Sequence, residues 1–104
     1  AFRVPVPTVS CSYMAFTLTK DATAEQINEA LEHAAANGMK NALTVCDQQC
    51  VSIDFQTDPH SSIVDETFTK VVDGNTVQVL SWYDNEWGYA MRVTELLQKV
   101  ISFM

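Results

Sequence analysis

The sequence predicts an α+β fold, in which an antiparallel or mixed sheet carries helices packed on one side, including a helix at the C-terminus. Two observations predict this class. Several short stretches alternate apolar and polar residues as strands do, whereas only two stretches repeat apolar residues at the helical period. With 104 residues and a hydrophobic content of 47%, the chain is long enough to build one core, so one compact unit is expected.

The first predicted elements are two strands. Residues 2–6 alternate apolar side chains with Arg3 and Pro5, and the prolines indicate an edge or an end of a sheet. Residues 9–19 predict a longer strand whose two faces both carry apolar groups, so we expect it to be covered on both sides. One face holds Met14, Phe16 and Leu18, and the other holds Val9, Cys11 and Tyr13.

The first helix carries the clearest signals. Thr23-Ala24-Glu25-Gln26 has the spacing of a capping box, in which the Thr hydroxyl and the Gln side chain satisfy unpaired backbone N–H groups. Asn37-Gly38 predicts a left-handed stop at the other end of the helix. Between these signals, one apolar stripe is made by Ile27, Ala30, Leu31, Ala34 and Ala35.

The middle of the chain predicts further short strands. Residues 42–46 and 51–55 are strand candidates because of their apolar and alternating side chains. Residues 67–72 and 76–83 flank Asp73-Gly74-Asn75, which is a hairpin signal because glycine tolerates the positive φ that such a turn needs.

The predicted last helix begins near Asp84 or Asn85. Its apolar stripe is made by Tyr89, Val93, Leu96, Leu97 and Val100. Around its start lie four aromatic residues that either pack in the core or form the wall of a site for a flat ligand, and packing is the commoner role of aromatic side chains. These residues are Trp82, Tyr83, Trp87 and Tyr89.

Composition argues against several classes of protein. The net charge of -7, with only six Lys and Arg residues, disfavours nucleic acid and anionic membranes as partners. The three glycines are dispersed, so neither a P-loop nor a dinucleotide-binding fingerprint is present. Cys11, Cys46 and Cys50 do not form an even disulfide set, and we expect them to be reduced. No metal site is predicted.

Two residues are candidates for ligand binding. Arg3 is one of two arginines, and its planar guanidinium suits a phosphate group, although an ordinary surface ion pair is the simpler role. Asn85 could cap the last helix, which is the better expectation from position alone. Its amide also offers a donor and an acceptor that would match a carboxamide. The cluster around Asp58 and His60 is interpreted as a turn and not as a catalytic group.

At these residues the sequence resembles a known family. Residues 1–7, Ala-Phe-Arg-Val-Pro-Val-Pro, are similar to the Ala-Phe-Arg-Val-Pro-Thr-Pro segment of glyceraldehyde-3-phosphate dehydrogenases. Residues 81–89 are similar to that family's Ser-Trp-Tyr-Asp-Asn-Glu-x-Gly-Tyr pattern. Residues 51–55 and 58–65 also match in order and spacing. The resemblance covers essentially all 104 residues, and residues 1–104 are expected to be the C-terminal portion of the catalytic domain.

The resemblance implies an oxidoreductase of glucose metabolism, acting in glycolysis or gluconeogenesis in the cytoplasm. Such an enzyme oxidises a phosphorylated aldehyde with NAD and inorganic phosphate, through a thioester on a cysteine. It further implies that Arg3 binds the substrate phosphate, that Asn85 hydrogen-bonds the nicotinamide carboxamide, and that Tyr89 lies near that ring. The family is oligomeric, and its sheet takes part in contacts between subunits.

The same resemblance implies that the reactive centre lies outside these residues. No cysteine here stands in the family's Ser-Cys-Thr-Thr-Asn motif, and the glycine-rich NAD-binding domain is also absent from these residues. No catalytic residue is therefore assigned, and the isolated chain is expected to be inactive, to bind NAD weakly and to self-associate. The start at Ala1, without Met, suggests a fragment or a processed chain. Two alternatives remain open: a fragment of erythrose-4-phosphate dehydrogenase, and a standalone, non-catalytic interaction domain.

Overall fold

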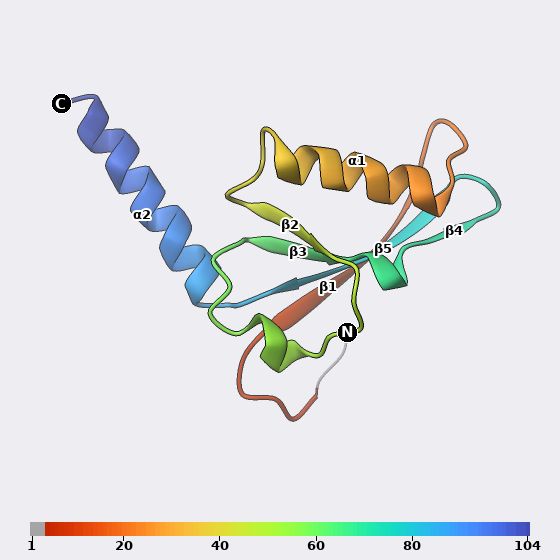
Figure 1. The fold of residues 1–104 in the computed structure, drawn as a ribbon, viewed down its shortest axis with the longest axis horizontal. Coiled ribbons are helices and arrows are strands. Elements are labelled where there is room, and N and C mark those ends of the chain that lie inside the picture. The colour runs from red at the N-terminus through yellow and green to blue at the C-terminus, as the bar shows by residue number, and fades with distance from the viewer. Residues whose placement is uncertain (1–3) are drawn as a thin grey trace.

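The computed structural model describes residues 4–104 and confirms the α+β class, with a mixed sheet of five strands and two helices (Figure 1). Two single-turn 3₁₀ helices, η1 and η2, interrupt the connections between strands. The elements in chain order are β1 (Ser10–Thr17), α1 (Ala24–Ala36), β2 (Leu43–Cys46), η1 (Ser52–Phe55), β3 (Ser62–Asp65), η2 (Glu66–Phe68), β4 (Lys70–Val72), β5 (Thr76–Tyr83) and α2 (Trp87–Ser102).

The sheet is organised around β5. One edge of β5 pairs antiparallel with β1 along its whole length, with Tyr13 opposite Leu80. Its other edge pairs first with β4 and then with β3, both antiparallel, and β2 adds to β3 as the one parallel pair. The pleat of β5 turns alternate side chains toward the core, and Val77 on this face is fully buried (0% exposed).

Helix α1 covers one face of this sheet (Figure 1). The predicted capping box is confirmed: the Gln26 backbone N–H donates to Thr23 Oγ1 at 3.2 Å, and the Thr23 N–H donates to Gln26 Oε1 at 3.0 Å. The predicted apolar stripe packs on the buried cluster, except for Ala30, which is exposed. The cluster consists of Leu43, Val64, Val77 and Val79, and the side chains of α1 on it are Ile27, Leu31, Ala34 and Ala35.

A second, smaller core is formed by one residue before β1, one at the end of η1 and one of β3. Val9, Phe55 and Ile63 are buried there, and Cys46, Cys50 and Trp82 pack against them. The Phe55 and Trp82 rings stack with centroids 5.6 Å apart, and the Trp82 indole N–H donates to Asp65 at 3.1 Å. Residues 47–55, which include η1, therefore form the connection that covers this part of the sheet, and they contain no strand.

The hairpin prediction is confirmed. Asp73 and Gly74 have φ values of +52° and +81°, which are left-handed backbone angles that favour glycine. The turn is held against the chain before α1, because the Ala22 N–H donates to the Gly74 carbonyl at 2.9 Å.

Three local expectations are wrong, and one strand was not predicted. Residues 51–55 form the turn η1 because the Asp54 carboxylate accepts from the Val51 N–H at 2.8 Å, which favours a tight turn over an extended ladder. The first strand was predicted over residues 2–6, but residues 4–6 are not in a strand. Residues 2 and 3 lie outside the residues that the structure describes. The left-handed stop is absent because Gly38 does not have a positive φ. Residues 62–65 form β3, which the sequence pattern did not predict.

The predicted covering of β1 on both faces is also wrong, since Tyr13, Met14 and Phe16 are all more than 40% exposed. This strand lies at the edge of the sheet, and α1 packs nearer to β2. Apolar residues on both faces of an edge strand thus do not by themselves indicate that both faces are buried.

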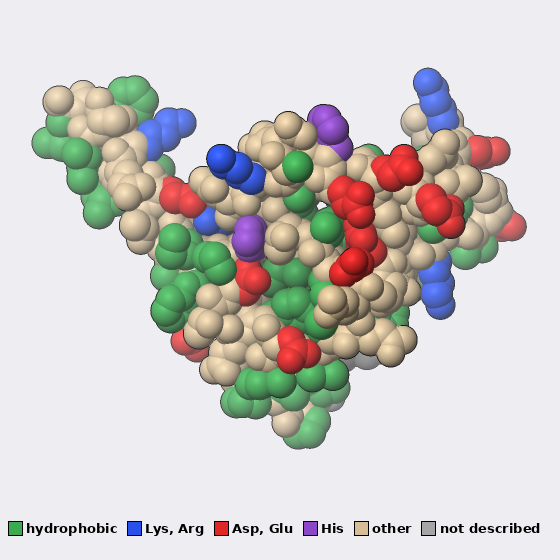
Figure 2. Space-filling model, viewed as in Figure 1, with side chains coloured by type: hydrophobic (Ala, Val, Ile, Leu, Met, Phe, Trp, Pro, Cys, Tyr) green, Lys and Arg blue, Asp and Glu red, His purple; other side chains and the backbone are tan. Residues whose placement is uncertain are grey.

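The expectation that helices pack on the sheet holds for α1 but not for α2. Helix α2 leaves the end of β5 and extends away from the body as an arm (Figure 1), and Gly88 is its one buried residue. The radius of gyration is accordingly 15.3 Å, against about 13 Å for a compact chain of this length. Hydrophobic side chains are exposed to solvent along this arm (Figure 2). Among the described residues no helix is long and apolar enough to cross a membrane.

Candidate functional site

The segment that joins β5 to α2 is organised by the buried carboxylate of Asp84, which is 6% exposed. One of its oxygens accepts hydrogen bonds from the N–H groups of Glu86 at 2.9 Å and Trp87 at 3.0 Å, at the start of α2. The other oxygen accepts from the Thr57 N–H at 2.8 Å. The bonds from Trp87 and Thr57 lower the pKa of Asp84, which outweighs the opposing effect of its burial.

Asp84 therefore performs the capping role that position alone suggested for Asn85. The Asn85 side chain is exposed and contacts the Ser10 hydroxyl instead, with Nδ2 2.7 Å and Oδ1 3.1 Å from Oγ. Its amide thus lies at the surface beside the first residue of β1. The second N–H of Nδ2 and the second lone pair of Oδ1 remain for further hydrogen bonds. The capping interpretation of Asn85 is replaced by an arrangement in which its amide is accessible to a ligand.

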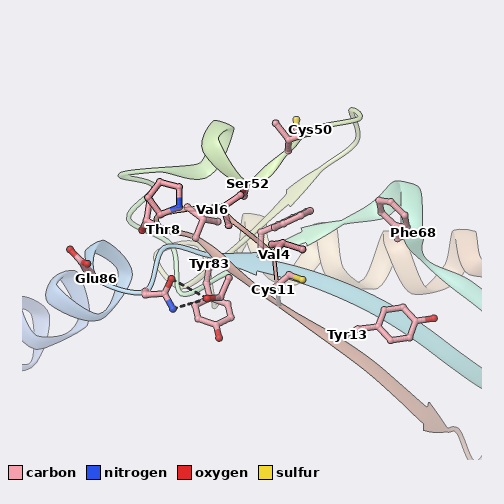
Figure 3. Close-up of a pocket in the computed structure, with 16 residues that line it drawn as sticks. Val4, Val6, Thr8, Cys11, Tyr13, Cys50, Ser52, Phe68, Tyr83 and Glu86 are labelled. Carbon is pink, nitrogen blue, oxygen red and sulfur yellow. Dashed lines mark hydrogen bonds between the residues drawn. The ribbon is translucent and has the colours of Figure 1, made fainter. Parts of the chain in front are cut away.

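Asn85 stands at the rim of an open hollow of about 1060 Å³. The hollow lies between the start of β1, the chain preceding it and the loop before η1, and Figure 3 shows its lining side chains converging from these elements. Tyr83 and Trp82 contribute aromatic surface to it.

The other aromatic residues do not join this wall. Trp87 is 49% and Tyr89 74% exposed, and both lie on α2 outside the lining of the hollow. The four aromatic residues near Asn85 are thereby divided: Trp82 packs in the smaller core and Tyr83 borders the hollow, whereas Trp87 and Tyr89 belong to the arm.

Arg3 lies outside the described residues, and its role stays a prediction from the sequence. The described residue that follows it, Val4, is part of the lining of the hollow. Val4 and Asn85 thus line the same hollow although they lie near opposite ends of the sequence. Ser10 and Asn85, which are hydrogen-bonded to each other, are separated by 75 residues.

The Asp58-Pro59-His60 segment forms a turn, as predicted. The Asp58 carboxylate accepts from the His60 N–H at 2.9 Å and lies 2.7 Å from His60 Nδ1. The other ring nitrogen, Nε2, lies 3.1 Å from the Lys40 carbonyl oxygen. Both ring nitrogens are therefore committed to local contacts, and the ring holds two loops together.

The three cysteines are free thiols. Cys46 and Cys50 nevertheless touch, with 3.4 Å between their sulfurs. The hydrogen bond with Cys46, together with burial, raises the pKa of Cys50 to about 11. Within residues 4–104 no group of three or more His, Cys, Asp or Glu side chains converges as metal ligands would.

Sequence reasoning missed two members of this site. Ser10 is the partner of Asn85, and no local pattern connects residues so far apart. Asp84, two residues before the N-cap residue Glu86, accepts from the first backbone N–H groups of α2, and here a signal existed, because an aspartate just ahead of a helix favours such bonds. The competing interpretation placed that role one residue too late.

The fold and the site define an α+β domain that presents one accessible amide at the rim of an open hollow. The chain belongs to the family described as the glyceraldehyde 3-phosphate dehydrogenase C-terminal domain, whose model matches residues 1–85. That match includes Arg3 and ends at Asn85, before α2 begins.

Curated relatives align over nearly all of the chain. Glyceraldehyde-3-phosphate dehydrogenase 2 of Bacillus subtilis is 45% identical over 104 residues, which is 100% of this chain and 31% of the relative. Glyceraldehyde-3-phosphate dehydrogenase of Mycolicibacterium smegmatis is 47% identical over 100 residues, covering 96% of this chain and 29% of the relative. The chain thus spans less than a third of the length of these relatives.

Proposed function

We propose that this chain is the C-terminal part of the catalytic domain of a phosphorylating, NAD-dependent glyceraldehyde-3-phosphate dehydrogenase, and that it forms one wall of the active site. The observation that carries this proposal is the accessible amide of Asn85 at the rim of the hollow. Because Asp84 already accepts from the N–H groups at the start of α2, the Asn85 amide is not needed there, and its hydrogen bonds are to the Ser10 hydroxyl at the surface.

In this proposal the chain's own residues bind and orient, and none of them reacts. Asn85 donates from Nδ2 and accepts at Oδ1, a pair that matches the carboxamide of nicotinamide, and the Ser10 hydroxyl holds the amide in place. Arg3 neutralises the phosphate of the aldehyde substrate through its guanidinium. NAD would supply the hydride acceptor at this site, and the contribution of this chain would be to orient its nicotinamide ring through Asn85.

The isolated chain is expected to be inactive. A thioester needs a nucleophilic cysteine with an adjacent base. Cys50 is a poor candidate, since its raised pKa of about 11 keeps it protonated at neutral pH. Neither Cys46 nor Cys11 stands in the sequence context of the family's nucleophile.

The substrate is proposed to be glyceraldehyde 3-phosphate in preference to erythrose 4-phosphate. The relatives named above are glyceraldehyde-3-phosphate dehydrogenases. We also propose that the whole enzyme acts in the cytoplasm as a homo-oligomer through its sheet. The exposed Tyr13, Met14 and Phe16 on edge strand β1 support the oligomer, since such apolar surface favours burial against another subunit.

A segment replacement tests the proposed function. The corresponding third of the Bacillus subtilis relative is exchanged for these 104 residues, and reduction of NAD is followed with glyceraldehyde 3-phosphate and inorganic phosphate. We expect a folded, active chimera, and we expect erythrose 4-phosphate to be turned over less efficiently. A folded chimera that lacks activity would contradict the proposal, as would one that prefers erythrose 4-phosphate.

Within that chimera, Asn85→Ala tests the residue that carries the proposal. Loss of a hydrogen-bonded pair to the carboxamide should raise KM for NAD by roughly tenfold, equivalent to about 1–1.5 kcal/mol. Asn41→Ala is the matched control, because Asn41 is also an exposed asparagine but is not part of the hollow's lining. Equal KM values for the two variants would remove Asn85 from the proposed site.

A further inference from the structure

Cys46 and Cys50 stand at the two ends of a short loop that follows β2, and their sulfurs are 3.4 Å apart. Cys46 is the last residue of β2 and is placed by pairing with Asp65 of β3. Both side chains pack against the buried Val9, Phe55 and Ile63. The proximity of the two thiols is therefore produced by the sheet and the smaller core, and not by sequence spacing alone.

This geometry is close to that of a disulfide. A disulfide bond measures about 2.05 Å, so the sulfurs need to approach by roughly 1.4 Å more. The intervening residues 47–49 are all exposed, so the loop can adjust without disturbing buried side chains. Among the residues that the structure describes, Cys46 and Cys50 are the pair of thiols in contact, whereas Cys11 lies on β1.

The hydrogen bonds of Cys46 and Cys50 indicate which thiol donates its proton to which acceptor. The Cys46 thiol lies 3.3 Å from the Gln48 carbonyl oxygen and donates to it, which leaves the Cys50 thiol as the donor to the Cys46 sulfur. Keeping this proton, together with burial, raises the pKa of Cys50 to about 11. Thiol exchange at this site should therefore be slow at neutral pH and should accelerate as the pH rises.

Cys50 is one of the residues that line the open hollow (Figure 3) and it is only partly buried, so a small solute can approach it. Cys46 does not line the hollow, but its sulfur contacts that of Cys50. One accessible thiol with a second thiol in contact is the arrangement that converts a mixed disulfide into an intramolecular one.

We propose that Cys46 and Cys50 form a reversible redox-modification site, which a small disulfide-bearing solute oxidises to an intramolecular disulfide. The Cys50 thiolate attacks one sulfur of the solute's disulfide, forming a mixed disulfide and releasing one thiolate. Cys46 then loses its proton and attacks the Cys50 sulfur, releasing the second thiolate. Two electrons pass from the cysteines to the solute, and its two thiolates take up the two protons.

The cross-link fixes one wall of the hollow. It ties residues 47–49 into a closed loop immediately before Val51 and Ser52, which line the hollow beside Cys50. Because the closed loop is short and lies at the surface, the bond is readily reduced again by small thiols. The proposal depends on the fold and the two thiols alone, so it stands or fails separately from the proposed function.

The test equilibrates the full chain with mixtures of oxidised and reduced glutathione, followed by acid quenching, intact-mass measurement and peptide mapping. We expect the dominant oxidised species to have lost two hydrogen atoms in mass, with the bond mapped to Cys46 and Cys50. Its equilibrium constant should exceed the value measured in denaturing urea by about tenfold or more, because folding holds the thiols together. The approach to equilibrium should be faster at higher pH.

Cys11→Ser is the matched control and should leave the oxidised species unchanged. Cys50→Ser should abolish it and leave only glutathione adducts, and Cys46→Ser should trap the adduct on Cys50. The proposal is overturned if all three thiols stay reduced, if Cys46 and Cys50 each carry glutathione in the wild-type chain, or if urea leaves the equilibrium constant unchanged. Because the wild-type chain provides the main readout, a variant that fails to fold does not decide the result.

Discussion

The two helices have similar sequence patterns and opposite surroundings. Both repeat apolar residues at the helical period, but the stripe of α1 packs on the buried Leu43, Val64, Val77 and Val79, whereas the stripe of α2 faces outward. Leu31 of α1 is half-buried, and Leu97 of α2 is 59% exposed. The difference arises from the connections. Residues 37–42 fold α1 back onto the sheet, while α2 continues directly outward from β5 (Figure 1).

This contrast separates what makes a helix from what makes a core. Local spacing, capping and propensity favour a helix in both segments. An apolar stripe stabilises the fold only when it packs against another surface. In α2 the contacts with the sheet and its loops are confined to the first turns of the helix. There Gly88 approaches the His60 backbone and Arg92 donates to the Ser61 hydroxyl at 3.2 Å. The arm should thus contribute little to the stability of the body.

The largest expected difference is between Val77→Ala in the core and Val93→Ala in the arm. Val77 is fully buried, so losing two methyl groups should reduce the free energy of unfolding by about 2–3 kcal/mol. Val93 is 46% exposed, and its variant should stay within about 0.5 kcal/mol of wild type. Urea unfolding measures both, and equal losses would contradict the distinction between body and arm.

The next largest effect concerns the junction between the two regions. Asp84→Asn should cost about 1–2 kcal/mol because its buried oxygens accept three backbone hydrogen bonds. The lowered pKa of Asp84 means that its contribution is complete at neutral pH and is lost as the pH falls below about 4, through the folded-state pKa. The difference between wild type and variant should therefore shrink on acidification. A difference that is constant down to low pH would rule out this linkage.

Gly88→Ala probes the close approach of the arm to the body. An added Cβ would lie 2.8 Å from the His60 carbonyl oxygen, so the first turn of α2 would have to shift. The clash should outweigh alanine's better helix propensity and leave a net loss of about 1 kcal/mol. Gly38→Ala is the control, since a Cβ there meets nothing within 4 Å and φ is not positive. It should be neutral or slightly stabilising, and a loss as large as that of Gly88→Ala would refute this account of the junction.

The smallest effect lies within the body, at Glu66. Burial, and then the nearby Glu32, raises the pKa of Glu66, so its charged form is disfavoured in the folded chain. Glu66→Gln should stabilise the chain at neutral pH by no more than about 0.5 kcal/mol, because the site is only partly buried. This gain should shrink as the pH falls through the folded-state pKa and vanish below the unfolded-state pKa, where wild-type Glu66 is neutral in both states. Glu29→Gln, on the exposed face of α1, should produce no such gain.

The sequence was informative where a structure depends on local chemistry. The capping box at Thr23 and the glycine turn at Gly74 could be predicted because neighbouring residues satisfy each other's backbone groups. The turn η1 could not, because alternation in residues 51–55 looks like a strand, and the bond from the Val51 N–H to Asp54 decides otherwise. β3 could not be predicted because its four residues are too few to show an alternation of apolar and polar side chains. Its parallel pairing with β2 is a contact between separate segments of the chain and leaves no local pattern.

The candidate site shows the same limit. Asn85 was identified from residue chemistry and a family resemblance, but its exposure depends on Asp84 taking the capping role and on Ser10 lying beside it. The contact with Ser10 does not follow from a local pattern, whereas an aspartate just ahead of a helix is a local signal. Arg3 was chosen in the same way, and its position lies outside the described residues.

Native-state hydrogen exchange of the chain tests the separation of body and arm most directly. Amides of β5 should open only with global unfolding, since β5 is paired on both edges and buried at Val77 and Val79. Amides of α2 beyond its first turns should exchange at least about a hundredfold faster, because local fraying suffices to expose them. Equal protection of residues 93–100 and of β5 would contradict the account, since it would mean that the arm belongs to the same cooperative unit as the core.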